Sequence, residues 1–393
     1  MTPYFLSFIC WLSVATAVLA GPIATTTIKL RFYSETIDLT LETALLSDAV
    51  ITMDESSIWA YYNQMESRPY QNLLNSLGRI QEQLQLNDWL YYELIHTTAQ
   101  QLLEHQPRAQ QTLFCWFLLS KLGYDTRLTY HQQQAYLYAY SEEDIFETPM
   151  IESDGRKFIN LSSIHHPMEQ TGIALNMLSF VANSGGKPFS FALQQLPSLQ
   201  PRPQEKVLAF NCREEHFSIK INTDRTICEV MKNYPIFAEQ RYFEVPMSES
   251  LRQSLLPQLR QIIKDRPVQE SLEILASFTR SAFHYKEDQE HFGYSKPMIA
   301  EEVFHYPYSD CEDRSVLFYS VVQELLHLPM IIIAFADHLT VAVGPDTPIS
   351  GQPILYEGRN YYICDPTGPK YSNDIGYAPK EFQDQRFEIL EQP

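Results

Sequence analysis

Two parts of this chain repeat the same pattern, and the repeat restricts its fold more than any other feature of the sequence. The apolar stretch Leu113–Leu122 matches Leu317–Leu326 at an offset of 204 residues. The pair Gly155-Arg156 matches Gly358-Arg359 at an offset of 203 residues. Because the two offsets are nearly equal, we predict an internal duplication of one structural unit.

Local patterns predict the elements of each unit. Residues 26–42 alternate between polar and apolar side chains, as the strands of a β-hairpin do, and 207–222 hold the corresponding position in the second copy. Helices are predicted at 87–105, 110–122, 252–264 and 268–282, strands at 127–130, 135–140 and 157–161, and a loop at 284–293. The predicted fold class is therefore α+β, with two tandem units that each contain a β-hairpin region and helices packed on an antiparallel sheet.

The boundary between the units is expected where regular structure is interrupted. Gly185, Gly186 and several prolines occur within residues 183–204. We predict a first unit at 21–186 and a second at 187–393. A chain of 393 residues is long enough for two such domains.

A cysteine stands at the predicted start of the helix in the second unit. Ser309 and Glu312 have the spacing of a capping box, and Asp310 and Asp313 are a second possible pair. Cys311 would lie in the first turn, where unpaired backbone N–H groups and the helix dipole favour a thiolate. The neighbouring carboxylates act in the opposite direction, because negative charge disfavours a thiolate. Cys311 is therefore a candidate nucleophile that needs a positively charged partner.

Two later residues are candidates for this partnership. The alternation in 336–343 predicts a strand that carries His338, and Tyr361–Asp365 predicts a second strand that ends at Asp365. Adjacent strands would allow the imidazole to face the sulfur and the carboxylate to orient the imidazole. We expect the catalytic residues to be Cys311, His338 and Asp365.

This order of Cys, His and Asp, with the motifs D-C-E-D-R-S, F-A-D-H-L-T-V-A-V and Y-Y-I-C-D-P-T-G, resembles the transglutaminase-like superfamily of cysteine enzymes. The resemblance covers roughly residues 248–379, and 300–304 is similar to the short helix that such proteins place before the nucleophile. It implies a papain-like core in each unit. It also implies a peptide or protein substrate, with transglutaminases, cysteine peptidases and peptide amidases as the possible activities and hydrolysis favoured over cross-linking.

The first copy lacks the three candidate residues. At the offsets of the repeat, Pro107, Gln134 and Ser162 hold the positions of the cysteine, the histidine and the aspartate. None of these side chains can replace a thiolate, an imidazole or a carboxylate. The first unit is therefore predicted to be degenerate and catalytically silent.

The N-terminal residues and the charge of the chain predict a compartment and exclude one class of partner. Met1–Ala20 has no charged side chain and ends in small residues that suit signal-peptide cleavage after Ala20, although a basic start is missing. We expect a secreted or periplasmic protein without a membrane span after cleavage, and an uncleaved anchor is the alternative. The sequence carries 48 acidic and 29 basic residues, a formal charge of −19, which argues against nucleic acid as a partner.

The remaining cysteines predict no further chemistry. Cys115 lies in an apolar stretch and Cys364 faces away from Asp365 on its predicted strand, so both are expected to be core thiols. Cys212 and Cys228 could form a disulfide in an oxidising compartment.

Metal and cofactor sites are not expected from the sequence. The cysteines and histidines lack the spacing of a zinc site. Asp310, Glu312 and Asp313 could contribute to a calcium or magnesium site, but carboxylates on one helix turn point to different sides, and capping explains them. We therefore expect neither a metal nor a cofactor.

These observations predict a transglutaminase-like cysteine enzyme that acts on peptide amide bonds by thiol acyl transfer. The alternative is a non-enzymatic binding or scaffold protein of two modules with the same fold. A thiol-directed electrophile separates the two, because only the enzyme needs an activated Cys311.

Overall fold

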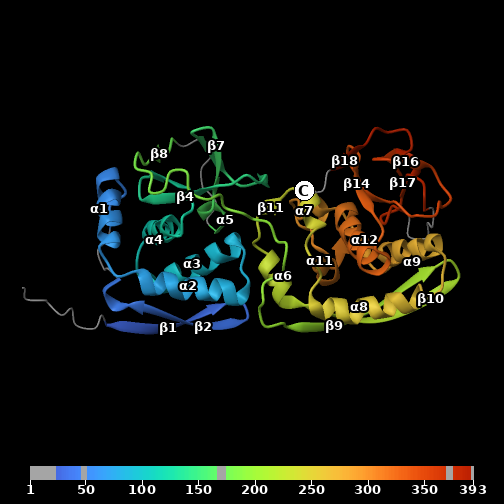
Figure 1. Ribbon diagram of the computed structural model, residues 1–393, viewed down its shortest axis with the longest axis horizontal. Coiled ribbons are helices and arrows are strands. Elements are labelled where there is room, and N and C mark those ends of the chain that lie inside the picture. Colours follow the sequence, from blue (N-terminus) through green and yellow to red (C-terminus); the bar gives the residue numbers. More distant parts are fainter. Residues whose placement is uncertain (1–23, 46–50, 166–173, 369–374, 391–393) are drawn as a thin grey trace, which may run out of the picture.

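The computed structural model describes residues 24–45, 51–165, 174–368 and 375–390. The described chain forms two units, each with a β-hairpin, a layer of helices and a five-stranded antiparallel sheet (Figure 1). The predicted signal peptide at 1–20 lies outside the described residues. In the parts of the chain described, no helix combines the length and the apolar character needed to cross a membrane.

The first unit begins with the predicted hairpin, in which β1 (Thr25–Phe32) pairs with β2 (Glu35–Glu42). Its alternating side chains bury Leu30, Phe32 and Leu39 against the helices. The helices of this unit are α1 (Glu55–Glu66), α2 (Gln71–Leu84), α3 (Asp88–Leu102), α4 (Arg108–Lys121) and α5 (Ser162–His165). The further strands are β3 (Thr126–His131), β4 (Gln134–Tyr140), β5 (Ile145–Phe146), β6 (Met150–Ser153), β7 (Arg156–Asn160) and β8 (Asn176–Met177).

The second unit repeats this plan with β9 (Pro203–Cys212) paired to β10 (Glu215–Asp224). Its helices are α6 (Arg225–Met231), α7 (Glu239–Tyr242), α8 (Glu249–Ile262), α9 (Val268–Ser281), α10 (Asp288–His291), α11 (Ala300–His305) and α12 (Cys311–Leu326). Its further strands are β11 (Ile236–Phe237), β12 (His284–Tyr285), β13 (Tyr308–Ser309), β14 (Met330–Ala334), β15 (Leu339–Val343), β16 (Pro353–Tyr356), β17 (Arg359–Ile363) and β18 (Glu388–Leu390).

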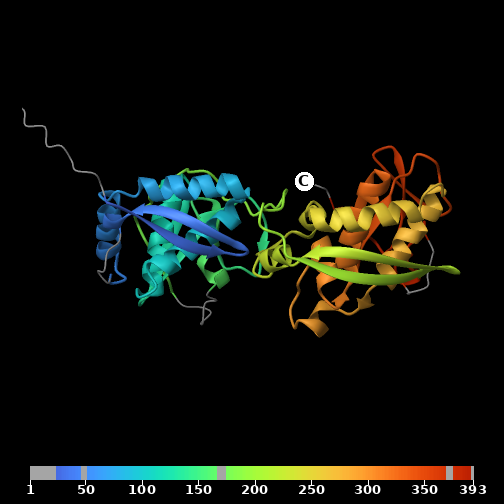
Figure 2. The same ribbon diagram turned by 90° about the horizontal axis from the view of Figure 1, so that it is seen from below.

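The helices hold each hairpin and each sheet together. In the first unit α2 and α3 pack on the hairpin, and α4 packs between α3 and β4. In the second unit α8 and α9 pack on the hairpin, and α12 packs between α9 and β15. Figure 2 shows both hairpins on the same side of the molecule, in front of the helices. Leu113 in α4 and Leu317 in α12 are fully buried, and burying a leucine side chain stabilises a fold by about 1.5–3 kcal/mol.

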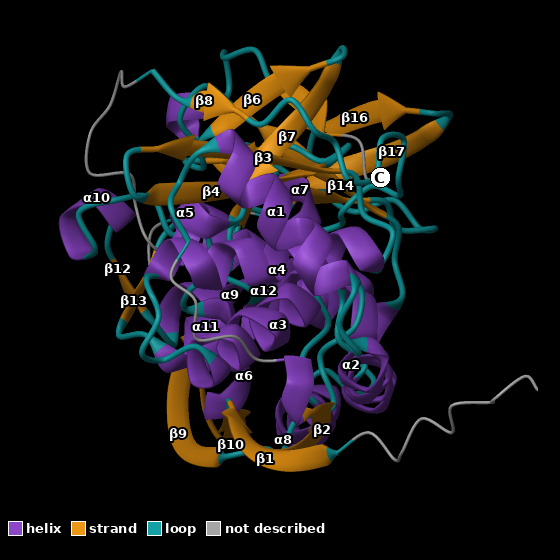
Figure 3. Cartoon of the chain, turned by 90° about the vertical axis from the view of Figure 1, so that its left-hand side faces the viewer, coloured by secondary structure: helices purple, strands orange, loops and turns teal. Residues whose placement is uncertain are grey.

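The two sheets have the same topology. The strand order is β6-β7-β4-β3-β8 in the first and β16-β17-β15-β14-β18 in the second. Their registers also agree: Leu128 pairs with Leu137, and the residues 204 positions later, Ile332 and Val341, pair with each other. The pairing of β4 with β7 corresponds to the pairing of β15 with β17 when residues of β4 are shifted by 204 positions and residues of β7 by 203. These are the two offsets found in the sequence. The layers of the two units overlie one another in the end view of Figure 3.

The units meet along a short pair of strands and an irregular connection. Ile145 and Phe146 of β5 pair with Phe237 and Ile236 of β11. Phe191 in the connection is fully buried, and its carbonyl accepts a hydrogen bond of 2.8 Å from the Tyr234 hydroxyl. Strand pairing and a side-chain hydrogen bond therefore both join the halves.

Most predicted elements occur within a few residues of their expected bounds, and three local predictions are wrong. The stretch 284–293 is not a loop throughout, because β12 and α10 form within it. His338 and Asp365 lie just outside strands: His338 precedes β15, and Asp365 follows β17 by two residues. A strand requires ladder partners, and the described ladders end at Leu339 and Ile363.

The proposed disulfide between Cys212 and Cys228 does not form, since both residues are free thiols. Cys212 lies at the turn end of the hairpin, whereas Cys228 follows Asp224 at its open end. Ten-residue strands span about 30 Å, far beyond the reach of a disulfide. Cys115 and Cys364 are buried core thiols, as predicted.

Candidate active site

The first candidate residue, Cys311, is the first residue of α12, and Asp310 is its N-cap. The capping box is formed by Asp310 and Asp313: the Asp310 N–H donates to Asp313 Oδ2 at 3.2 Å. The Ser309 hydroxyl instead accepts a hydrogen bond of 3.2 Å from Arg314 Nε, so the predicted box of Ser309 with the residue three positions later is wrong. The sequence therefore predicted the helix start correctly, and of the two possible capping boxes the one between Asp310 and Asp313 forms.

The Cys311 thiol is buried and has two polar neighbours. Its Sγ donates to Glu312 Oε2 at 2.8 Å, and the backbone N–H of Leu339 donates to the sulfur. Burial first, then the charge and hydrogen bond of Glu312, raise the pKa of the thiol well above its usual value, although the Leu339 N–H acts in the opposite direction. The resting sulfur is therefore a neutral thiol.

The second candidate, His338, lies in the turn between β14 and β15. The Phe335 N–H donates to the His338 carbonyl oxygen at 2.8 Å, which closes this turn. The imidazole stacks on Phe382, with 4.5 Å between ring centroids and 9° between planes. Packing and backbone bonding thus hold the ring in one orientation.

The third candidate, Asp365, bonds to this ring. His338 Nε2 lies 3.2 Å from Asp365 Oδ2, and the Thr367 hydroxyl and N–H donate to Asp365 Oδ1 at 2.5 and 2.8 Å. Arg280 donates to the Asp365 carbonyl oxygen. Burial alone would raise the pKa of Asp365, but the hydrogen bond and charge of His338 and the bonds from Thr367 outweigh it and lower the pKa.

The structure thus joins two of the three predicted residues directly and places the third beside them. The sulfur of Cys311 contacts the N–H of Leu339, which immediately follows His338. The Ser315 hydroxyl donates to the Leu339 carbonyl at 3.0 Å, so the first turn of α12 is fixed to the start of β15. Within the described residues, the thiol of Cys311 bonds to Glu312 and makes no hydrogen bond to the imidazole.

A cavity of about 570 Å³ opens on one side of this arrangement. His338, Asp365 and Thr367 form part of its wall, together with Arg280 and Tyr285. Cys311, which is 7% exposed, is not among its lining residues. A volume of this size accepts a peptide side chain or a short peptide segment.

Several residues that shape the site were missed in the sequence. Thr367 follows Asp365 by two residues, a spacing at which a hydroxyl can return to a carboxylate, and this signal could have been used. Phe382 and Arg280 reach the site from distant segments, and no local pattern marks them.

In the first unit, the residues at the three matched positions begin or close secondary-structure elements. Pro107 is the N-cap of α4, and Gln134 begins β4. The Ser162 hydroxyl donates to Asn160 Oδ1 at 2.9 Å and accepts from the Leu137 N–H at 2.9 Å. These bonds close the end of β7 onto β4.

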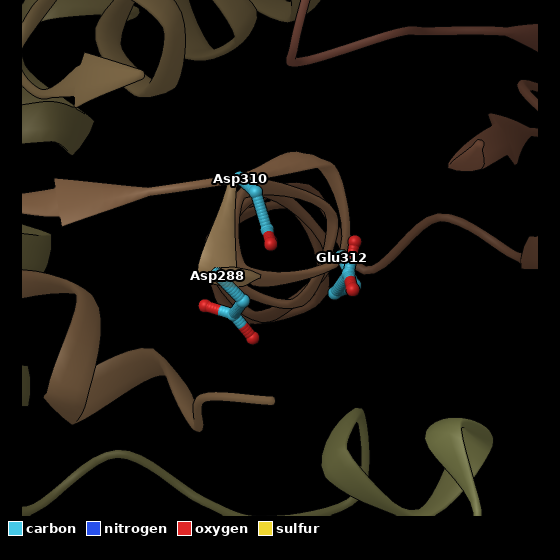
Figure 4. Close-up of side chains that lie close together, drawn as sticks. All are labelled: Asp288, Asp310 and Glu312. Carbon is cyan, nitrogen blue, oxygen red and sulfur yellow. The ribbon is translucent and has the colours of Figure 1, made fainter. Parts of the chain in front are cut away.

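One group of acidic side chains lies next to the thiol. Asp288, Asp310 and Glu312 each place a possible ligand oxygen within 4.8 Å of the other two (Figure 4). Asp288 belongs to α10, which the sequence did not predict, so this grouping was not foreseen. Carboxylates in such a group can hold a cation.

Comparisons with known proteins do not assign this chain to a family. No family model, no curated protein and no solved structure matches it significantly.

Proposed function

We propose that the protein is a transglutaminase-like cysteine enzyme that hydrolyses amide bonds of peptides or proteins, with Cys311, His338 and Asp365 as its catalytic residues. The observation that carries this proposal is the hydrogen bond between His338 and Asp365 at the cavity wall, with the Cys311 sulfur against the next residue of the chain. The order of a helix with cysteine, then an antiparallel pair of strands near histidine and aspartate, agrees with the resemblance seen in the motifs.

Each residue has a distinct role in the proposed reaction. His338 takes the thiol proton through the ring nitrogen that does not face Asp365, and the thiolate attacks the carbonyl carbon of the amide. The tetrahedral intermediate then collapses, His338 returns the proton to the leaving amine, and an acyl-thioester remains on Cys311. Water, deprotonated by His338, then attacks the thioester. The C–S bond breaks, His338 returns the proton to the Cys311 sulfur, and the acid is released.

The charged groups around Cys311 and His338 determine what must change before the thiol can react. Glu312 holds the thiol in its resting state, so the Sγ–H must turn from Glu312 toward His338 before the proton is transferred. Asp365 holds the imidazole and stabilises the imidazolium that forms. The backbone N–H of Cys311, in the first turn of α12, is available to the oxyanion because helix-start N–H groups have no intrahelical partner.

The test is hydrolysis of a defined mixture of peptide amides and short peptides, followed by mass spectrometry. We expect product from the wild type, and a loss of at least about 10³-fold in Cys311→Ala and His338→Ala. Cys364→Ala is the matched control, because this buried cysteine lies next to Asp365 in sequence and faces the core. Equal turnover in Cys311→Ala and the wild type would refute the proposal.

A second candidate function is a binding module that retains the three residues without catalysis. The buried, neutral Cys311 thiol, bonded to Glu312 and absent from the cavity lining, favours it. Peptide retention without turnover, undiminished in Cys311→Ala, would support this candidate against the enzyme.

A further inference from the structure

A second cavity, of about 280 Å³, lies where the two units meet, and we call it the junction cavity. Phe146 and Glu147 of the first unit line it, together with residues 236–240, which run from β11 into α7 of the second unit. Figure 1 shows β11 and α7 between the two units. The pairing of β5 with β11 thus brings residues of both units around one cavity.

The walls of the junction cavity are largely apolar and include the rings of Phe146 and Phe237. Phe237 is buried, whereas Phe146 is 51% exposed. Covering an exposed phenylalanine ring is favourable, because it removes apolar surface from water. The volume lies near the lower end of the range for ligand sites, about 300–1,000 Å³, so the junction cavity has room for one side chain.

Two carboxylates in the lining, those of Glu147 and Glu239, have no partner. Among the residues that the structure describes, neither makes a hydrogen bond or an ion pair, and no lining residue is basic. The basic residues next to the lining segments, Arg241 and Lys296, form ion pairs with other glutamates. The described part of the chain therefore supplies no counter-ion to this cavity.

A narrow void continues the junction cavity toward the thiol. Glu239 and Pro297 line both spaces. The void also contacts Glu312 and Leu339, the two residues that bond to the Cys311 sulfur. Partial burial, then the charge of Glu312, raise the pKa of Glu239, so a cation bound there would offset unfavourable charge. With a volume of about 10 Å³ the void holds at most about one water molecule, so a bound side chain ends at Glu239.

This void and the cavity at His338 contact different sides of α12. An α-helix turns by about 100° per residue, so Glu312 projects about 100° from Cys311 in one direction and Arg314 about 60° in the other. Glu312 lines the void, and Arg314 lines the cavity that contains His338. A peptide that occupied both cavities would therefore pass Cys311 between them.

The chemistry of the junction cavity fits an arginine side chain. A guanidinium is planar, stacks on aromatic rings and bonds to carboxylates through parallel N–H groups. Its methylene stem can cover apolar walls while the charge stays at a polar group. A lysine ammonium is more strongly hydrated and cannot stack in this way. The formal charge of −19 also favours encounters with basic peptides.

We propose that the junction cavity binds the side chain of an arginine residue in a peptide. Phe146 and Phe237 contact the stem and the flat face of the guanidinium, and Glu147 and Glu239 accept its hydrogen bonds. That this peptide is also the substrate rests on the proposed function, and the amide to be cleaved then lies close to the arginine. The first unit, which lacks the three candidate catalytic residues, thereby takes part in recognition.

Calorimetric titration of full-length Cys311→Ala protein, which has no nucleophile, tests this proposal. The probes are acetylated and amidated pentapeptides with alanine at four positions and a central arginine, lysine or citrulline. Citrulline is a neutral side chain of nearly the same shape as arginine, so we expect the citrulline peptide to bind at least about tenfold more weakly than the arginine peptide. The lysine peptide should lie between them.

Substitutions in the same background locate the site. Glu147→Gln should weaken the arginine peptide about tenfold and bring its affinity close to that of the citrulline peptide, and Phe146→Ala should weaken it about fivefold. Glu152→Gln is the matched control, since it removes an exposed carboxylate of the first unit that does not line the junction cavity. The affinity should not change in this control.

No binding of the arginine peptide, equal affinity for the citrulline peptide, or an affinity unchanged by Glu147→Gln would overturn the inference. These titrations do not depend on turnover. Selective binding by a protein whose wild type hydrolyses no peptide would keep the arginine site and reject the proposed hydrolysis. Hydrolysis without a preference for arginine peptides would reject the site alone.

Discussion

Glu312→Gln should make Cys311 more reactive, although it removes a residue that touches the proposed nucleophile. The substitution keeps the size of the side chain and removes a negative charge from the oxygen that lies 2.8 Å from the sulfur. Because that charge and hydrogen bond contribute to the raised pKa of the thiol, the pKa must fall when they are lost.

The expected size of the effect follows from Coulomb's law and thiol reactivity. At an effective dielectric constant of about 20, unit charges about 4 Å apart interact by about 4 kcal/mol, an upper bound here because Glu312 is partly exposed. Because one pKa unit corresponds to about 1.4 kcal/mol, about two thirds of this energy would lower the pKa of the Cys311 thiol by about two. That fall raises the thiolate fraction at pH 7 about 100-fold. Nucleophilicity falls with pKa at a Brønsted slope of about 0.4–0.5, so alkylation should accelerate about tenfold.

The assay is alkylation by iodoacetamide at pH 7, with the modified Cys311 peptide quantified by mass spectrometry. Glu324→Gln is the control, since it removes a carboxylate from the last turn of the same helix, where it bonds to Arg252 at 3.0 Å. An unchanged or slower rate in Glu312→Gln would refute the electrostatic account of this thiol.

Three further outcomes follow from the structure. The lowered pKa of Asp365 means that its ionised form stabilises the fold above its unfolded-state pKa of about 3.9 and that this contribution is lost as pH falls through the folded value. The wild type should therefore melt higher than Asp365→Asn at pH 7, and the difference should shrink as the pH falls below about 3.9. Burial, then the charges of Asp313 and Glu312, raise the pKa of Asp310, so its ionisation costs stability as pH rises. At pH 8, Asp310→Asn should therefore melt above the wild type. Leu113→Ala and Leu317→Ala, matched positions of the repeat, should each cost about 2–5 kcal/mol in denaturant unfolding, and a cost below about 1 kcal/mol at either would contradict its place in a packed core.

The repeat could be predicted from the sequence because its signals are local and occur twice. The apolar stretches of the two units are 204 residues apart, and their Gly-Arg turns are 203 residues apart. The strand pairings of the two sheets keep these offsets, because no residue is inserted between paired positions. The start of α12 was predictable for the same reason, since capping depends on residues three apart.

The surroundings of the candidate residues could not be predicted, because distant segments supply them. Phe382 stacks on His338 from a short 3₁₀ helix, Lys380–Phe382, that lies more than 40 residues later in the chain. Asp288 joins Asp310 from a segment whose sequence predicts a polar loop. Burial changes the chemistry as well: a helix start favours a thiolate in solution, whereas the enclosed Cys311 beside Glu312 is a neutral thiol.

The alkylation rate of Cys311 in the wild type and in His338→Ala tests the central claim most directly. If His338 activates the sulfur, Cys311 should react faster than the fully buried Cys115 and Cys364, and His338→Ala should slow it at least about tenfold. His284→Ala, which removes an exposed imidazole from the same cavity wall, should leave the rate unchanged. A Cys311 that reacts no faster than Cys115, or equally fast without His338, would contradict the claim that these residues form one catalytic unit.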